Sequence, residues 1–252
     1  MQNEGARARL EAITTAGRTA LGMFVGSTDA SVTEVAASAG FDFVVIDCEH
    51  SAMDALAATQ HVRAAEATGI LPFVRLWDTS PGVVQRFLDL GCQGIVVPHA
   101  ESAEQVAAVV SATRLPPRGN RSTCPVVRGS GFAAERWDDY IEWSQDNVLV
   151  IPIVESATGL KNVDEIAAVD GVDLVYLGAV DLAADLGTAV NGPEIVDAWL
   201  TIQDAARKHG LRAMGPILSD VDQGGAGAFV LGMDLRILRN AAVALIESAR
   251  RG

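Results

Sequence analysis

The stretch AGFDFVVIDCEHS (39–51) shows the structural unit that recurs along the whole chain. The helical stretch before it, TEVAASAG (33–40), ends in Gly40, where a glycine C-cap is expected. The run FDFVVIDCE (41–49) is apolar on both faces, which is typical of a strand covered on both sides in a parallel sheet. Polar residues close the run. The stretch therefore predicts a helix, a glycine stop and a buried strand with polar residues at its carboxyl end.

Seven further runs resemble this strand, and helical stretches separate most of them. The runs are ALGMFVG (20–26), LPFVRLW (71–77), GIVVPHA (94–100), VLVIPIVES (148–156), VDLVYLGAV (172–180), LRAMGPILS (211–219) and MDLRIL (233–238). Eight strands alternating with helices over 252 residues predict an α/β protein with a (β/α)8 TIM barrel as one domain, residues 1–252. The alternative is an open doubly wound sheet, but the first strand ends in GSTDAS, which lacks the dinucleotide-binding glycine spacing.

Composition limits the possible partners. The chain has 49% apolar and 20% charged residues, which indicates a folded protein, and its net charge is −13. That charge argues against nucleic acid and anionic membranes as partners, although a pocket can still attract a small anion. Three cysteines without a CxxC pair argue against a disulfide framework or structural zinc. No signal peptide and no apolar run of about 18 residues is visible, so we expect a cytoplasmic protein.

One segment breaks the regular spacing of strands and helices. About 50 residues separate the fourth and fifth strands, and the excursion at about 114–144 is rich in Pro, Gly and Arg. We expect it on the carboxyl-end face of the barrel, as a lid or a subunit contact. The alternative is a surface loop without a role.

Polar residues at the ends of the predicted strands form two constellations. Glu155 and Asp181 each close an apolar run, and two converging carboxylates suit a hard divalent cation. They could instead be satisfied acids at the barrel mouth or a helix cap. Asp47 and His50 lie three residues apart, so the carboxylate could orient the imidazole as a general base. The alternative is a surface turn with an incidental histidine.

Arg75 is a third candidate, because a guanidinium at the end of an apolar strand needs an acid or an anionic ligand. Pairing with a barrel acid would satisfy it without any catalytic role. The other histidines are weaker candidates. His61 and His209 are expected to face solvent, and His99 has no evident partner.

Together these motifs resemble the HpcH/HpaI aldolase family of class II pyruvate aldolases. The resemblance runs from about residue 20 to the C-terminus and is carried by D-x-E-H, the arginine of the third strand, E-x-x-x-G-x-x-N and G-x-x-D-L-x-x-D-L-G. It implies a barrel of the phosphoenolpyruvate/pyruvate type and a homohexamer built as a trimer of dimers. It also implies Mg²⁺, Mn²⁺ or Co²⁺ as cofactor and a small 2-oxo acid as substrate, cleaved to pyruvate and an aldehyde.

The resemblance also assigns roles to positions of this chain. Glu155 and Asp181 match the metal ligands, His50 the catalytic base and Asp47 its orienting partner. Arg75 matches the arginine that holds the 2-oxo oxygen. Two further assignments are the substrate-carboxylate segment, Gly178, Ala179 and Val180, and the acid that reaches a neighbouring subunit's site, Asp89.

The sequence departs from the family pattern at several positions near the predicted site. Ile153 stands where better-known members carry glutamine, and Cys48 replaces a glycine. Gly178-Ala179-Val180-Asp181 lacks the usual proline. An oxaloacetate decarboxylase or an enolate-condensing biosynthetic enzyme on the same site is therefore an alternative. A non-catalytic barrel that binds an oxo acid is a further one, which the retained base and arginine disfavour.

Overall fold

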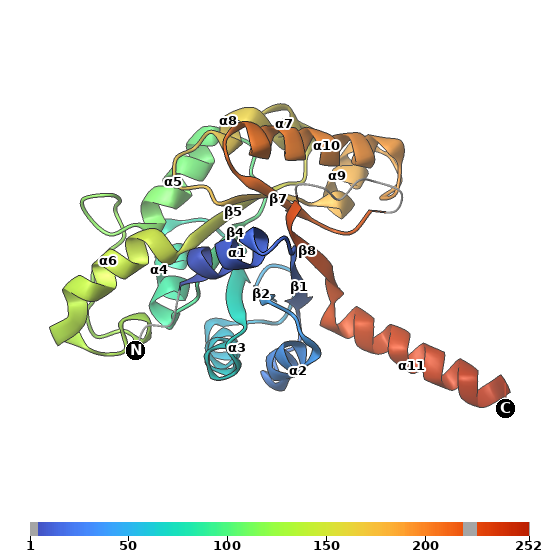
Figure 1. Ribbon diagram of the computed structural model, residues 1–252, viewed down its shortest axis with the longest axis horizontal. Coiled ribbons are helices and arrows are strands. Elements are labelled where there is room, and N and C mark those ends of the chain that lie inside the picture. Colours follow the sequence, from blue (N-terminus) through green and yellow to red (C-terminus); the bar gives the residue numbers. More distant parts are fainter. Residues whose placement is uncertain (1–4, 219–225, 252) are drawn as a thin grey trace.

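The computed structural model describes residues 5–218 and 226–251, and within them parallel strands close into one barrel in the order β1 to β8 (Figure 1). This confirms the predicted (β/α)8 barrel. The strands are β1 (Ala20–Val25), β2 (Phe43–Asp47), β3 (Leu71–Arg75), β4 (Gly94–Val97), β5 (Leu149–Val154), β6 (Leu174–Leu177), β7 (Arg212–Gly215) and β8 (Ala226–Met233).

Helices cover the outside of the barrel. They are α2 (Ser31–Ala39), α3 (Ala55–Thr68), α4 (Pro81–Leu90), α5 (Ala103–Thr113), α7 (Ala157–Lys161), α8 (Val163–Ala167), α9 (Ala179–Leu186) and α10 (Pro193–Lys208). Helix α1 (Ala6–Thr15) closes the amino end of the barrel, because Ala6 and Leu10 pack on the first residues of several strands. No helix of the described residues is long and apolar enough to cross a membrane.

The glycine stops of the sequence pattern appear as expected. Gly40, Gly69 and Gly91 each end a helix in the left-handed conformation, with φ of 95°, 82° and 95°. A residue with a side chain is strained at such φ values, so glycine fixes where the helix ends and the next strand begins. The carboxyl ends of the strands consequently reach one common face.

The eighth strand lies earlier than its predicted position at 233–238. It is Ala226–Met233, and helix α11 (Asp234–Arg251) begins directly after it. The Asp234 carboxylate accepts hydrogen bonds from the backbone N–H groups of Gly26 and Ser27 at 3.0 and 2.9 Å. This contact to the loop after β1 marks the end of the strand. The prediction was wrong because AGAFVLGM is rich in small residues, whereas LRIL carries the stronger apolar signal.

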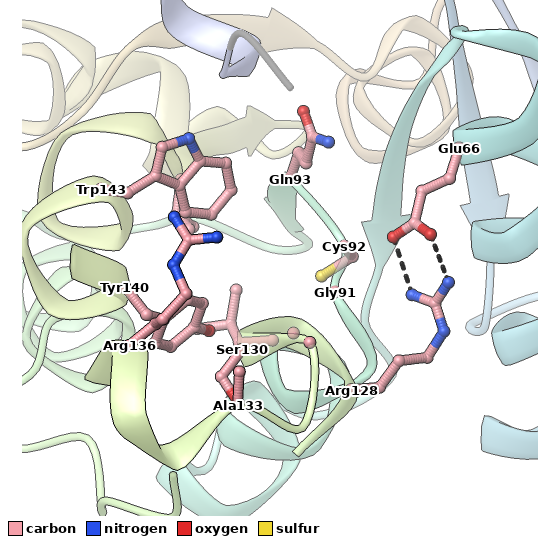
Figure 2. A pocket seen from close by; sticks show the side chains of 14 residues that line it. Glu66, Gly91, Cys92, Gln93, Arg128, Ser130, Ala133, Arg136, Tyr140 and Trp143 are labelled. Atoms are coloured by element: carbon pink, nitrogen blue, oxygen red, sulfur yellow. Dashed lines mark hydrogen bonds and ion pairs between the residues drawn. The ribbon is translucent and has the colours of Figure 1, made fainter. Parts of the chain in front are cut away.

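The excursion between α5 and β5 packs near the amino end of the barrel, so its expected place on the carboxyl-end face was wrong. It follows a helix rather than a strand, and it contains α6 (Trp137–Asn147). A cavity of about 300 Å³ lies beneath it, lined by Gln93 and Val148, which immediately precede β4 and β5 (Figure 2). The segment is therefore no lid over the strand ends.

The arginines of the excursion serve its packing. Arg128 pairs with Glu66 of α3 (Figure 2). It also donates to the Leu90 carbonyl oxygen. Three others form ion pairs: Arg118 with Asp146, Arg121 with Asp89 of α4 and Arg136 with Asp139. Their density in an acidic chain thus reflects internal ion pairs.

His61 is fully buried, which contradicts the expectation that it faces solvent. Its Nδ1 lies 2.8 Å from the Thr33 hydroxyl, and its Nε2 lies 3.0 Å from the Ser27 carbonyl oxygen. These contacts tie α3 to α2 and to the loop after β1. Burial lowers the pKa of His61 below its usual value, because the charged imidazolium loses its hydration.

We expect His61 to make the protein less stable in acid. The unfolded chain takes up the proton near pH 6.5, whereas the folded chain takes it up only at lower pH, so the free energy of unfolding falls as pH drops below about 6.5. Urea unfolding at several pH values should show a smaller acid loss for His61→Gln than for wild type. His50→Gln, at an imidazole that is 60% exposed, should keep the wild-type slope, and equal slopes for all three would contradict the assignment.

Helix α11 projects away from the barrel (Figure 1). Its large apolar side chains are exposed, among them Leu238 at 65% and Leu245 at 72%, while its last turn carries Arg250 and Arg251. Asp234 is its one buried residue in the described part. An apolar face of this length that no described part of the chain covers is typical of a subunit interface.

Candidate active site

A cavity of about 600 Å³ opens at the carboxyl ends of the strands. Its walls bring together several of the predicted site residues, which are Arg75, Glu155, Gly178, Ala179, Val180 and Asp181. Phe24 and Tyr176 also line it, as do Arg236, Ile237 and Asn240 at the start of α11. The barrel therefore collects side chains from β1, β3, β5 and β6 and from two helices at one mouth.

Arg75 is held rigidly at this mouth. Its Nε and Nη2 donate to the two oxygens of Asp47 at 2.9 and 2.7 Å, which is a bidentate pair. The two residues are direct partners in the register of β2 and β3. Glu49 lies 3.3 Å from Nη1, and the guanidinium sits 4.6 Å from the centre of the Phe24 ring. Two acids and an aromatic face thus fix the cation beside the cavity.

His50 has a different neighbour from the one expected. Asp47 Oδ1 accepts hydrogen bonds from the His50 backbone N–H at 3.3 Å and from Arg75 Nε at 2.9 Å. The acid nearest the imidazole is Glu49, at 3.8 Å from Nε2. The reason is the register, which places Arg75 rather than the imidazole directly opposite Asp47. Asp47 therefore positions the turn that carries His50, and the imidazole itself is 60% exposed.

Glu155 is the most buried acid beside the cavity. Its Oε1 accepts the His99 backbone N–H at 2.6 Å. Burial raises its pKa above the usual value, and the negative charges of Asp181 and Glu49 act in the same direction. Asp181 lies in the first turn of α9 and is exposed to the cavity. A cation between the two carboxylates would relieve this repulsion.

The backbone at Gly178 leaves room for that arrangement. A Cβ at residue 178 would lie 2.5 Å from the Glu155 Cβ and 2.8 Å from its Oε2. Only glycine lets the chain between β6 and α9 pass so close to the carboxylate. The donor set, two carboxylates open to water and substrate, fits a hard divalent cation such as Mg²⁺, which keeps several waters. In the described residues no cluster of three or more His, Cys, Asp or Glu competes as a metal site.

Three residues of the site were not predicted as functional. Glu49 lies between Arg75 and both imidazoles, since its Oε1 is 3.4 Å from His99 Nε2. His99 sits at a left-handed φ of 48°, with Nδ1 3.2 Å from Glu155. Its place at the end of a strand-like run was the available signal. Tyr176 lies inside a strand, where no sequence signal separates a site residue from core.

Asp89 lies outside the cavity of its own chain. It is near the end of α4, and its Oδ1 accepts from Arg121 Nη2 at 2.6 Å. The side chain of Arg121 is 1% exposed and also bonds the Tyr140 hydroxyl at 3.1 Å. Within one chain this acid anchors the excursion.

Comparison with known proteins places this barrel among carbon–carbon bond enzymes. A profile described as HpcH/HpaI aldolase/citrate lyase matches residues 20–241. The 5-keto-4-deoxy-D-glucarate aldolase of Klebsiella pneumoniae is 35% identical over 226 residues, 87% of this chain and 88% of the relative. The hydroxypyruvate/pyruvate aldolase of Deinococcus radiodurans is 37% identical over 198 residues, covering 76% and 69%. Among solved structures, the citrate synthase SbnG matches with a TM-score of 0.85 and 31% identity, covering 96% of this chain and 98% of that one.

Proposed function

Because the chain belongs to the HpcH/HpaI aldolase/citrate lyase family, we propose that it is a class II aldolase that cleaves a 4-hydroxy-2-oxo acid to pyruvate and an aldehyde. The observation that carries this proposal is one cavity in which Arg75 stands beside Glu155 and Asp181. A fixed cation and a carboxylate pair suited to a divalent metal are what a developing enolate needs. The barrel would accordingly be of the phosphoenolpyruvate/pyruvate type.

Glu155 and Asp181 would hold the metal, which we propose to be Mg²⁺, Mn²⁺ or Co²⁺. When bound, it would supply a Lewis acid that polarises the 2-oxo group. The alternative aldolase strategy, a Schiff base, needs a lysine in the barrel. The two lysines of the chain lie on surface helices, Lys161 in α7 and Lys208 in an ion pair with Asp164.

The residues of the chain divide the remaining work. Arg75 points its guanidinium at the 2-oxo oxygen and stabilises the charge that grows there as the C3–C4 bond breaks. Ala179 and Val180 lie in the first turn of α9, where backbone N–H groups lack helical acceptors and can receive the substrate carboxylate. His50 removes the proton of the 4-hydroxyl group, directly or through a water molecule, and Asp47 fixes its turn.

The first experiment is a screen for pyruvate release. Purified protein with Mn²⁺ is offered a panel of 4-hydroxy-2-oxo acids, with oxaloacetate as a parallel substrate. We expect pyruvate from at least one aldol substrate, at a higher kcat/KM than from oxaloacetate. Pyruvate from oxaloacetate alone would instead favour the decarboxylase alternative, which the aldolase names of the curated relatives do not favour.

His50 provides a sharper distinction between these reactions. His50→Ala should lower kcat for aldol cleavage by about 10²- to 10⁴-fold, the usual contribution of a general base. Decarboxylation of oxaloacetate removes no hydroxyl proton, so its rate should change by less than about threefold. His209→Ala is the matched control and should leave both rates unchanged. Equal losses of the two activities in His50→Ala would contradict the base assignment.

We further propose that the chain forms a homo-oligomer through α11, with a hexamer of three dimers as the expected assembly. The exposed apolar face of this helix supports the proposal, and Asp89 would then reach a neighbouring subunit's site. Light scattering coupled to gel filtration should give the mass of an oligomer for wild type and a smaller mass for Leu245→Glu. Leu200→Glu, on the exposed face of α10, should keep the wild-type mass. A monomeric wild type would contradict this assembly.

A further inference from the structure

Tyr176 lines the active-site cavity with a phenol side chain that has no hydrogen-bond partner among the described residues. The residue belongs to β6, is 8% exposed and lines the cavity with Arg75 and Glu155. Its hydroxyl forms no hydrogen bond with any residue that the structure describes. A phenol at the wall of a cavity with no protein partner is available to bond a ligand or a water.

The surroundings of the hydroxyl identify the kind of ligand. The charged groups that act on it are Arg75, Glu155 and Asp47, of which the first two line the same cavity. Burial raises the pKa of Tyr176, so the phenol keeps its proton and is a hydrogen-bond donor at neutral pH. A neutral donor in the same cavity as an arginine and a carboxylate suits an oxygen that gains negative charge.

Packing holds the ring in this orientation. Tyr176 lies 6.2 Å from Phe24, centre to centre, with the two ring planes 29° apart, and Phe24 in turn carries Arg75 over its face. The cross-strand partner of Tyr176 in β5 is Ile153. Ile153 also lines the cavity, and it adds no polar group to it. Tyr176 therefore supplies a polar group at the level where the neighbouring strand lacks one.

We propose that the Tyr176 hydroxyl donates a hydrogen bond to the 2-oxo oxygen of the substrate and to the enolate oxygen derived from it. The inference rests on the proposed aldolase function and adds a residue to it. The phenol and Arg75 then form a two-donor site for that oxygen. Tyr176 does not need to transfer its proton, because the hydrogen bond that it donates becomes stronger as negative charge develops on the enolate oxygen.

The test is Tyr176→Phe, which keeps the ring and its packing and removes only the hydroxyl. We expect kcat for pyruvate release to fall about 10- to 100-fold, somewhat less than the loss of a lone oxyanion donor because Arg75 remains. Oxalate, a stable mimic of the pyruvate enolate, should bind about tenfold more weakly in calorimetric titrations of the Mn²⁺-loaded protein. The Kd for Mn²⁺ without oxalate should stay within about twofold of wild type.

Tyr140→Phe is the matched control, since Tyr140 is the other tyrosine of the chain and does not line the active-site cavity. It should leave kcat and oxalate affinity unchanged. Wild-type kcat and oxalate affinity in Tyr176→Phe would overturn the proposal and leave the aldolase function standing. Absence of pyruvate release by wild type would instead overturn the function itself, so the two failures are distinguishable. A purely structural role predicts a lower Tm with unchanged oxalate affinity, and that result would also overturn the proposal.

Discussion

Glu155→Gln is expected to abolish metal binding and almost all activity. The substitution keeps the shape of the side chain but removes the negative charge, and it leaves Asp181 as the remaining acid of the pair. We expect the Kd for Mn²⁺ to rise at least about 100-fold and kcat to fall about 10³-fold, which corresponds to several kcal/mol of lost electrostatic stabilisation. Free Mn²⁺ can be counted by electron paramagnetic resonance during a titration.

Burial makes this variant informative about stability as well. The carboxylate of Glu155 is desolvated and lies near two other acids, Asp181 and Glu49. Repulsion between these carboxylates therefore destabilises the metal-free protein. Glu155→Gln should therefore fold at least as well as metal-free wild type. Glu165→Gln, an exposed acid of α8, is the control and should bind Mn²⁺ normally. Wild-type Mn²⁺ affinity in Glu155→Gln would show that the metal site is wrongly placed.

Arg75→Ala is the second variant with a large expected effect. Loss of the guanidinium removes one of the charges that stabilise the enolate, and kcat should fall about 10²- to 10³-fold. The Kd for Mn²⁺ should stay within about threefold, because Arg75 is not a metal ligand. The same change leaves Asp47 and Glu49 buried without a counter-charge, so we also expect a stability loss of about 3–5 kcal/mol.

Arg75→Lys separates the catalytic effect from the loss of stability. Lysine keeps a positive charge for the two acids but lacks the planar fork that binds Asp47 at both oxygens. We expect a smaller loss of Tm than in the alanine variant, with kcat still reduced at least about tenfold. Arg63→Ala, at an exposed position of α3, should behave like wild type. Unchanged turnover in both Arg75 variants would exclude this residue as the clamp of the enolate.

The barrel was predictable because its signal is repeated and local. The run of 41–49 is apolar on both faces and follows a glycine that ends a helix, Gly40, and this pattern recurs along the chain. Seven of the eight strands lie within the predicted runs. The eighth was misplaced since β8 is built from small residues, while the amphipathic start of α11 gave the stronger signal. The contact of Asp234 with the loop after β1 joins residues more than 200 apart and leaves no local pattern.

The site was predictable as a set of residues but not as a set of contacts. The carboxyl ends of all strands meet at one face of a barrel, so polar residues at the strand ends were predicted to share a site. This was sufficient to identify Arg75, Glu155 and Asp181. Which partner each one takes depends on register across strands, and that is why Asp47 binds Arg75 rather than the imidazole of His50. Tyr176 could not be distinguished from a core residue, because a tyrosine within an apolar strand has the same sequence pattern as a residue of the hydrophobic core.

The most direct test of the aldolase assignment is pyruvate release from a 4-hydroxy-2-oxo acid by one protein preparation in three conditions. These are protein with Mn²⁺, the same protein with excess EDTA, and the EDTA-treated protein after Mn²⁺ is restored. The site built by Glu155, Asp181 and Arg75 predicts turnover in the first condition, loss of at least about 99% in the second and recovery in the third. Full turnover in excess EDTA would contradict a metal-dependent aldolase.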